Sequence, residues 1–571
     1  MSAPSEALND SRSGLLRWAV AGSVLVWLAF PPVGWSYLAW LGPVLWLRWI
    51  GAADLPGSRP YGVLWLAGLV FWLLAVHWIR LPHPLNYIAW ISLAAYLGAY
   101  LPVFVALSRV GVKNCGLPLW LVAPVVWTGL DWLRGHLMTG FLMGSLAHTQ
   151  VGLPVMIQIA DLGGEYVVTF LIVLVAAGIT QVMVDHALVL RGQWRPLLAL
   201  LPGFVAIVAA IVYGHMQSVD IGLRQKGASG PRVALIQGHT RADWKYNPDR
   251  KRTIMEEHRR LSLEAVRDAQ DHPVDLIIWP ETAFREALAT VEEGYQVPPH
   301  IDPDNLIVAT NKLAELARQL NAGLLVGIEH YHLSGAANGR PQVAVFNSSA
   351  LVDRQGMVRG TYDKMHRVLL GEYVPFSDWL PFLDQLTPIT GAIDPGKRPV
   401  AMQLDNVVYA TNICYETVVP HLIRRHVVEL TNAGKTPDVL VNLTNDAWFW
   451  GSSELDMHLA CGVFRAVEMR RPMVIAANGG LSAHINPYGT VVQKTPRQQT
   501  ATLLVDLKIP ARAGSRQHNN PYPSAYAAYG DWFAIACVVC CVALAAQPFC
   551  RAKRGAPPAA LYGSPAKEPS A

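Results

Sequence analysis

The stretch YATNICYE at residues 409–416 joins a run of apolar and β-branched residues to a thiol and a carboxylate. The pattern predicts a buried strand over 406–413 and a helix over 420–433. Cys414 therefore lies at a strand end and shortly before a helix N-terminus, where the dipole and the free amides stabilise a thiolate. Such a cysteine also fits an unreactive core position. The stretch alone leaves both roles open.

The predicted strand belongs to a polar block at 215–525, in which short apolar runs alternate with amphipathic segments. Continuous apolar strands are typical of a sheet that helices cover on both faces. We therefore predict an α/β layered domain of about 300 residues. The other predicted strands are 232–237, 274–279, 323–328, 342–352, 438–443 and 473–477, and the other predicted helices are 248–270, 307–320 and 455–470.

The remainder of the 571-residue chain is too apolar for a soluble protein. Charged residues make up 15% of the sequence, against roughly 25% in soluble domains. The 20 tryptophans fit a protein with many membrane–water boundaries. The net charge of +5 is small, and no basic stripe with interleaved aromatic residues indicates a nucleic-acid partner.

Apolar segments near the length of about 20 residues that crosses a bilayer precede and follow the polar block. We predict a seven-helix membrane domain at 15–214 and a final transmembrane helix at 530–548. The first segment lacks a clear cleavage site, so we expect a helix rather than a signal peptide. The seven predicted spans are 15–32, 36–50, 61–79, 88–108, 117–136, 165–184 and 197–214.

Lysine and arginine residues between the spans set the expected orientation. With eight spans they all fall on one side, so the segment 1–14 and the tail 549–571 are cytoplasmic and 215–525 faces the other side. The loop 137–164 then lies beside the polar block, either packed on the helices or as a lip that guides a lipid. The basic residues are Arg12, Arg17, Arg48, Arg59, Arg109, Lys113, Arg191, Arg195, Arg551, Lys553 and Arg554.

Two further groups of titratable residues lie in the polar block. The strand at 274–279 runs into a proline, which ends the strand and presents Glu281 at its carboxyl end, where α/β folds bind ligands. Lys364 lies in YDKMH at 362–366, just before a Gly- and Pro-containing loop, GEYVPF. Taken singly, Glu281 and Lys364 also fit ordinary loop charges.

Together, the IIWPE, YDK…GEYVP and ICYE elements occur in the order that resembles the carbon–nitrogen hydrolase (nitrilase) superfamily, whose sites use a Glu–Lys–Cys triad. The flanking helices narrow the resemblance to the membrane-embedded apolipoprotein N-acyltransferase family, over roughly residues 10–550. It implies a multi-span α-helical membrane bundle plus an extramembrane αββα domain. Further matching segments are QG at 237–238, NLTNDAWF at 442–449, FRAVE at 464–468 and ANGG at 477–480.

The resemblance implies N-acyl transfer by a ping-pong mechanism. Cys414 would take an acyl chain from a phospholipid as a thioester and pass it to the α-amino group of the diacylglyceryl-cysteine of an apolipoprotein. Glu281 would be the base, and Lys364 would stabilise the oxyanion. The resemblance implies no cofactor and no metal. We expect a monomer in a bacterial inner membrane, with the catalytic domain in the periplasm.

The family pattern also implies supporting roles. Glu372 matches the family's second glutamate, which orients the lysine. Tyr415 would pack beside the acyl chain, while Glu416 would order the site or meet the incoming amine. Trp244 fits either a mobile hydrophobic gate or an anchored surface aromatic residue. Tyr373 would line the chain pocket.

The cysteines and histidines carry less information. The seven cysteines predict neither a zinc site nor a disulfide framework. Cys461 falls on the apolar face of a predicted helix, where we expect a core residue. His366 and His458 have no second ligand at a diagnostic spacing, so we do not expect them to bind a metal.

Two other functions stay open at this point. A membrane-tethered amidase or nitrilase would use the same residues but release its acyl group to water. The apolar residues in loops near the motifs favour transfer instead. A transporter or a non-enzymatic scaffold is the other alternative, but spans that line transport routes carry charges. Here the nearest candidates, Asp131 and His77, lie toward helix ends.

Overall fold

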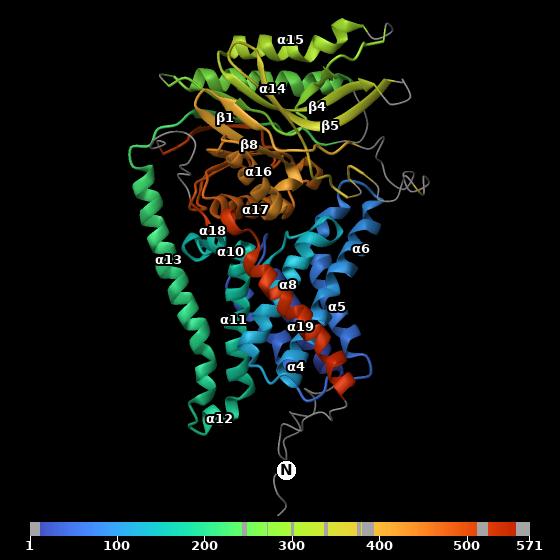
Figure 1. Cartoon of the computed structure of the whole chain (residues 1–571), viewed down its shortest axis with the longest axis vertical. Helices are drawn as coiled ribbons and strands as arrows, with labels where there is room; N and C mark the ends of the chain where they lie inside the picture. Colours follow the sequence, from blue (N-terminus) through green and yellow to red (C-terminus); the bar gives the residue numbers. More distant parts are fainter. Residues whose placement is uncertain are drawn as a thin grey trace, which may run out of the picture.

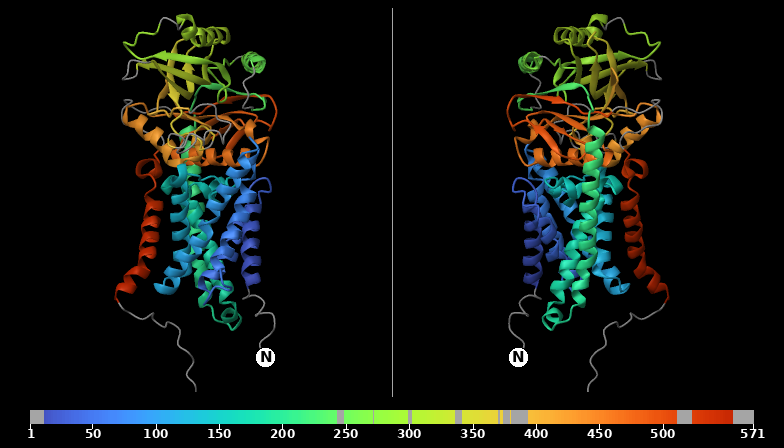
Figure 2. Two further views of the ribbon diagram at one scale, coloured as in Figure 1. Left: turned by 90° about the vertical axis from the view of Figure 1, so that its right-hand side faces the viewer. Right: turned by 90° about the vertical axis from the view of Figure 1, so that its left-hand side faces the viewer.

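A helical bundle and a two-sheet domain are stacked along the long axis of the protein (Figure 1). The computed structural model describes residues 12–242, 248–270, 272–298, 302–335, 341–369, 371–373, 379, 393–510 and 523–554. Trp244 lies outside the described residues, so its role as a gate stays a prediction. The sheets lie at one end of the bundle in every view, which makes the molecule elongated (Figure 2).

The polar block contains two β-sheets. Their strands are β1 (Arg232–Gln237), β2 (Leu276–Ile278), β3 (Phe284–Val291), β4 (Gly323–Gly335), β5 (Pro341–Val352), β6 (Val358–Asp363), β7 (Ala401–Leu404), β8 (Val407–Ile413), β9 (Val439–Asn445), β10 (Met473–Asn478), β11 (Ala483–Ile485), β12 (Val491–Lys494) and β13 (Ala501–Asp506). The first sheet has the order β13-β1-β2-β4-β5-β6, with β3 also paired to β4. The second has the order β12-β11-β10-β9-β8-β7.

The centre of each sheet is parallel and its borders are antiparallel. β2 pairs in parallel with β1 and β4, and β9 pairs in parallel with β8 and β10. In a parallel sheet the carboxyl ends of neighbouring strands meet at one edge, which is where α/β folds build their sites. The parallel strands β2 and β8, which precede Glu281 and Cys414, therefore define the edges at which a site can form.

Helices cover the outer face of each sheet, so the domain has the expected αββα layers. α14 (Pro248–Asp268) and α15 (Pro303–Leu320) pack on the first sheet, and α16 (Pro420–Asn432) and α17 (Glu454–Met469) pack on the second. α15 begins where the Asp302 carboxylate accepts a hydrogen bond from Asp304 N, a regular N-cap. Between the sheets, apolar side chains such as Leu235, Ile278, Val441 and Leu443 form a dry core.

The bundle is built from apolar helices of unequal length. They are α2 (Arg12–Leu28), α3 (Leu38–Leu41), α4 (Val44–Gly51), α5 (Pro60–Ala75), α6 (Asn86–Gly98), α7 (Tyr100–Arg109), α8 (Leu119–His136), α11 (Glu165–Val184), α13 (Leu201–Gln225) and α19 (Trp532–Arg554). Among the described residues, three helical stretches are long and apolar enough to cross a membrane, namely Asn86–Asn114, Glu165–Val184 and Arg195–Gln225. The predicted spans at 88–108, 165–184 and 197–214 coincide with them.

The predicted span at 36–50 is broken in the structure. It forms α3 and α4, which are interrupted at Gly42 and Pro43. Even as one straight helix, residues 38–51 would be about 21 Å long at 1.5 Å per residue. The hydrocarbon core of a bilayer is roughly 30 Å thick. The apolar helices Ser13–Leu28, Pro60–Ala75 and Trp532–Pro548 are also shorter than 18 residues. The count of eight spans therefore stays a prediction.

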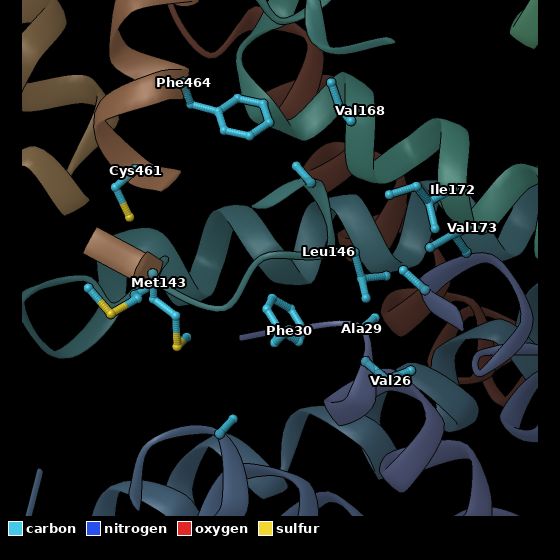
Figure 3. Close-up of a cluster of buried hydrophobic side chains, with 14 of the residues drawn as sticks. Val26, Ala29, Phe30, Met143, Leu146, Val168, Ile172, Val173, Cys461 and Phe464 are labelled. Atoms are coloured by element: carbon cyan, nitrogen blue, oxygen red, sulfur yellow. The ribbon is translucent and has the colours of Figure 1, made fainter. Parts of the chain in front are cut away.

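The loop at 137–164 is packed between the bundle and the catalytic domain. It folds into short helical turns whose side chains are mostly buried. Figure 3 shows Met143 and Leu146 of this loop in one apolar cluster with Val168 of α11 and with Cys461 and Phe464 of α17. Cys461 is fully buried there, as the sequence predicted. The packed form of the loop is thus observed, whereas a lipid-guiding role stays a prediction.

Candidate active site

Cys414 lies at a sharp turn after β8. It opens a short 3₁₀ turn, Cys414–Val418, and its φ of +52° is in the left-handed region. A non-glycine residue is strained in this region, and such strain persists only where the surrounding contacts hold it. The turn points the thiol out of the strand direction, toward the ends of β2 and β6. The backbone at Cys414 is therefore held in a conformation that the residue would not choose alone.

Glu281 lies just beyond β2, at the carboxyl end of this strand. Its Oε1 accepts a hydrogen bond from Asn347 Nδ2 at 2.7 Å, and its Oε2 accepts one from Asn445 N at 3.0 Å. The turn passes so close to β4 that a Cβ at Gly327 would lie 2.3 Å from Pro280 O. A glycine in β4 is thus required for the WPE turn to place its carboxylate in the site.

Lys364 follows β6 and is fully buried. Its Nζ donates to Glu372 Oε1 at 2.8 Å and lies 3.6 Å from Glu281 Oε1. Burial alone would lower the pKa of Lys364, but the charges of Glu372 and Glu281 outweigh it and hold the pKa above its ordinary value. The ammonium group therefore stays charged beside the two carboxylates.

Glu372 completes the charged cluster. Besides Lys364, its carboxylate accepts hydrogen bonds from Val368 N at 2.9 Å and from Asn347 Nδ2 at 3.2 Å. Burial would raise the pKa of Glu372, but the Lys364 ammonium overcomes this effect and lowers it. The structure thus places Glu372 in contact with Lys364, and its role in orienting the lysine stays a prediction.

The Cys414 thiol and the Glu281 carboxylate lie close enough to shift each other's pKa. Burial and the charge of Glu281 raise the pKa of the Cys414 thiol well above its ordinary value. Burial and Glu281 therefore outweigh any stabilisation of the thiolate by the nearby helix terminus. The site holds a neutral thiol, and the carboxylate is placed to take its proton during attack.

Burial also raises the pKa of Glu281, and Glu372 adds to this effect, while Lys364 opposes it. A carboxylate with a raised pKa is a stronger base than an ordinary one. The arrangement brings a base, a cation and a nucleophile together from three distant parts of the chain. Sequence reasoning had named all three.

Asn347 was missed by sequence reasoning. It lies on β5, and its amide nitrogen donates to both Glu281 and Glu372. The residue is buried and stands in the run VFNSSALV, so three polar residues interrupt an otherwise apolar strand. This interruption was the available signal, but no spacing marks an asparagine as a partner of acids far along the chain.

Glu416 is enclosed by hydrogen-bond donors. Its carboxylate accepts hydrogen bonds from the Tyr362 hydroxyl and from the backbone N–H groups of Ile413, Met365 and His366, at 2.7–3.0 Å. It is fully buried, and burial raises its pKa to about 7. These contacts favour the ordering role over contact with the incoming amine, and both roles stay predictions.

The structure describes two of the predicted aromatic residues, Tyr415 and Tyr373. The Tyr415 hydroxyl donates to Gly140 O in the loop 137–164, and its ring stacks on His366 with centroids 5.9 Å apart. The Tyr373 ring lies 4.4 Å from the Arg367 guanidinium carbon. Contact of either ring with an acyl chain stays a prediction.

Two groups of described side chains each bring three potential metal-binding atoms within 4.8 Å of one another, and His458, which we did not expect to bind a metal, belongs to one of them. In the group of Asp446, Glu454 and His458, a direct hydrogen bond of 3.3 Å already joins Asp446 Oδ1 to His458 Nδ1. In the other group, the rings of His136 and His421 are stacked 4.3 Å apart, so their in-plane nitrogen lone pairs cannot converge on one ion.

Comparisons with known proteins now identify the family. Residues 22–178 match the family model "Apolipoprotein N-acyltransferase N-terminal domain", and residues 232–517 match "Carbon-nitrogen hydrolase". An apolipoprotein N-acyltransferase from Geobacter metallireducens is 32% identical over 539 residues, covering 93% of this chain and 95% of that protein. The chain belongs to the apolipoprotein N-acyltransferase family. It is therefore an acyltransferase of the carbon–nitrogen hydrolase superfamily.

A second relative agrees with this membership. An apolipoprotein N-acyltransferase from Rhodopirellula baltica is 29% identical, covering 90% of this chain and 95% of that protein. Among solved structures, an amidase from Nesterenkonia sp. is 19% identical, with a TM-score of 0.33, and covers 49% of this chain and 91% of its own. Membership of the acyltransferase family sets aside the hydrolase, the transporter and the scaffold considered above.

Proposed function

We propose that this enzyme moves an acyl chain from a phospholipid, through a thioester on Cys414, to the α-amino group of the diacylglyceryl-cysteine of an apolipoprotein. The observation that carries the proposal is the convergence of Glu281, Lys364 and Cys414, all buried or half-buried in one cluster. The pairing of a thiol with a base and a cation is what acyl transfer through a covalent intermediate requires.

In the first half-reaction, Glu281 takes the thiol proton as Cys414 Sγ attacks the carbonyl carbon of the sn-1 ester. Lys364, together with backbone N–H groups near Cys414, stabilises the negative charge on the carbonyl oxygen. The ester C–O bond then breaks, and Glu281 returns the proton to the departing alkoxide of the lysophospholipid. A thioester on Cys414 remains.

In the second half-reaction, the α-amino group of the acceptor attacks the thioester carbonyl. Glu281 takes a proton from the nitrogen, the C–S bond breaks, and the proton returns to Cys414 as the amide leaves. Glu372 and Asn347 keep Lys364 and Glu281 in register during both steps, as their hydrogen bonds indicate. The cycle needs no cofactor.

A location in the membrane suits this reaction for a physical reason. Both substrates are lipids, and each CH₂ group withdrawn from the bilayer costs about 0.8 kcal/mol. A site fixed at the end of a helical bundle avoids most of this cost. We place the protein in a bacterial inner membrane as a multi-pass monomer, with both termini cytoplasmic and the segment 215–525 periplasmic, because the basic residues favour this orientation.

Mass spectrometry of the purified protein with phospholipid tests the proposal. We expect a mass increase of one acyl group on Cys414, absent in Cys414→Ala, that a diacylated lipopeptide with a free amine discharges. The same lipopeptide with an acetylated N-terminus should leave the adduct in place. A folded protein that never acquires the adduct, or one that loses it equally to buffer, would overturn the proposal.

A further inference from the structure

The backbone carbonyl of Cys414 is bound by two side chains from outside its own turn. Asn442 Nδ2 lies 3.2 Å from this oxygen, and His458 Nε2 lies 3.1 Å from it. Asn442 belongs to β9 and His458 to α17, so the contacts come from two different layers. They hold the peptide group that follows the strained residue, whose φ is +52°. Loss of these contacts would let the turn relax.

His458 is itself held by a carboxylate. Its Nδ1 lies 3.3 Å from Asp446 Oδ1, and both side chains are buried. Burial would lower the pKa of His458, but the hydrogen bond to Asp446 and the nearby carboxyl groups raise it to about 10. The imidazole is then protonated over the neutral range, so each ring nitrogen donates a hydrogen bond. One goes to Asp446 and the other to the carbonyl of Cys414.

Asp446 is itself held by a residue of β9. Its Oδ1 accepts a hydrogen bond from Thr444 Oγ1 at 2.6 Å. The carboxylate thus keeps its place beside His458, whose ring in turn contacts the Cys414 carbonyl. None of these residues takes the thiol proton, since Glu281 is the base that contacts Cys414.

Glu454 is the other titratable group that faces this network from α17. Burial and the neighbouring Asp446 raise its pKa well above the ordinary value, which disfavours a second negative charge beside Asp446. Glu454 therefore competes less than Asp446 for the imidazolium charge of His458.

A glycine pair makes room for Asp446. A Cβ at Gly480 would lie 2.2 Å from Asp446 Oδ2, and Gly479 has a φ of +67° with Ala447 packed against it. No residue larger than glycine therefore fits between β10 and Asp446 at position 480. The ANGG segment at 477–480, one of the segments that match the family pattern, therefore packs against the Asp446 carboxylate.

We propose that Asp446 and His458 are positioning residues: Asp446 orients His458, and His458 holds the Cys414 carbonyl, which keeps Cys414 in its attacking conformation. The inference rests on the proposed function, since it concerns the nucleophile of that reaction. Neither residue contacts an acyl chain, so both act through Cys414. Their loss should lower kcat and leave KM unchanged.

The test compares His458→Leu with His458→Gln in the full-length enzyme. We expect His458→Leu to slow acyl-adduct formation on Cys414 by about 10- to 100-fold, the usual cost of a misplaced reacting group. His458→Gln keeps a nitrogen donor for the carbonyl and should recover most of the rate. His484→Gln replaces a buried histidine of β11, outside this network, and should react as the wild type does.

A second measurement separates positioning from folding. Alkylation of Cys414 by iodoacetamide, measured on protein with a wild-type melting temperature, should slow in parallel with acylation in His458→Leu, Asp446→Asn and Gly480→Ala. Equal rates in His458→Leu and the wild type, or no difference between the leucine and glutamine variants, would overturn the inference. Absence of any adduct in the wild type would instead refute the proposed function.

Discussion

Cys414 is half-buried beside Glu281, and this environment disfavours the thiolate. Burial and the adjacent carboxylate raise the thiol pKa, so the proposed reaction starts from a neutral thiol next to the carboxylate that we propose as its base. Lys364 balances the charge of Glu281 and of Glu372. In this mechanism the attack depends on an ionised and aligned Glu281 carboxylate.

Glu281→Gln keeps the shape and a hydrogen-bonding group but removes the base. We expect adduct formation on Cys414 to fall by about 10²- to 10⁴-fold, the usual contribution of a general base. Intact mass measured over time gives the rate. Glu329→Gln, an exposed position on β4 opposite Asn347, is the matched control and should react normally. A glutamine variant with an unchanged rate would exclude proton transfer to Glu281.

The pH dependence of acylation follows from the same carboxylate. Because burial raises the pKa of Glu281 above its ordinary 4.5, protonation as the pH falls removes the base at a pH higher than 4.5. The rate of adduct formation should therefore fall through an acid limb above that value. Asn347 donates to the ionised form, so Asn347→Ala should move the limb to higher pH. An acid limb at the same pH in the variant and the wild type would show that this hydrogen bond does not lower the pKa of Glu281.

Among the elements, α17 is distinctive because it is buried on nearly all sides. Every residue from Glu454 to Met469 is buried except Asp456, although the segment carries Arg465 and Glu468. Arg465 donates to Glu165 at 2.6 Å and lies 2.9 Å from Glu468. The helix therefore joins the second sheet to the first residue of α11 through a buried ionic contact.

Arg465→Met would leave Glu165 and Glu468 buried without their cation. We expect a loss of about 3–5 kcal/mol in the free energy of unfolding, the usual result of breaking a buried ion pair. Thermal unfolding in detergent measures it. Arg425→Met on α16 removes the exposed pair with Glu429 and should cost about 1 kcal/mol or less. Similar losses in the two variants would mean that burial does not strengthen the contact.

Sequence patterns predicted the central elements better than the border elements. All seven predicted strands form, and they include the parallel strands β1, β2, β8, β9 and β10, which are buried on both faces and read as apolar runs. The strands that were missed, β3, β6, β7, β11, β12 and β13, are mostly half-exposed or very short, so polar residues interrupt their pattern. A border strand forms because a neighbouring strand supplies its hydrogen bonds. The local sequence does not show that such a neighbour will be present.

The same distinction applies to the site. Glu281, Lys364 and Cys414 could be named because each ends an apolar run with an unusual reactive group, and because their order resembles a known family. Asn347 and His458 could not, because their partners lie 66 and 44 residues away. Such a polar residue meets its hydrogen-bond partner only after distant parts of the chain fold together. The spacing of residues in the sequence therefore does not predict the contact.

At the scale of the whole molecule, the catalytic domain and the bundle share one apolar core. The cluster that contains Val26 and Ile172 of the bundle also contains Val427 of α16 and Phe464 of α17. Figure 3 shows part of this contact. The two halves are therefore not independent domains joined by linkers, and each covers apolar surface of the other.

A fragment of residues 226–510 should not behave as a soluble protein. Its release exposes the apolar faces of α16 and α17, and large exposed apolar patches cause aggregation. We expect the fragment to be aggregated in buffer and to bind a hydrophobic dye, as light scattering and dye fluorescence would report. The full-length protein in detergent is the control. A monodisperse fragment with a wild-type melting temperature would show that the shared core is dispensable.

The burial of α17 on both sides also bears on the depth of the site. The helix carries His458, which lies 3.1 Å from the Cys414 carbonyl oxygen, and Arg465 of the same helix contacts Glu165 at the start of α11. Cys414 is thereby tied to the bundle through one helix, which sets its level relative to α11. We therefore expect a lipid donor to bring its ester to this level in order to react.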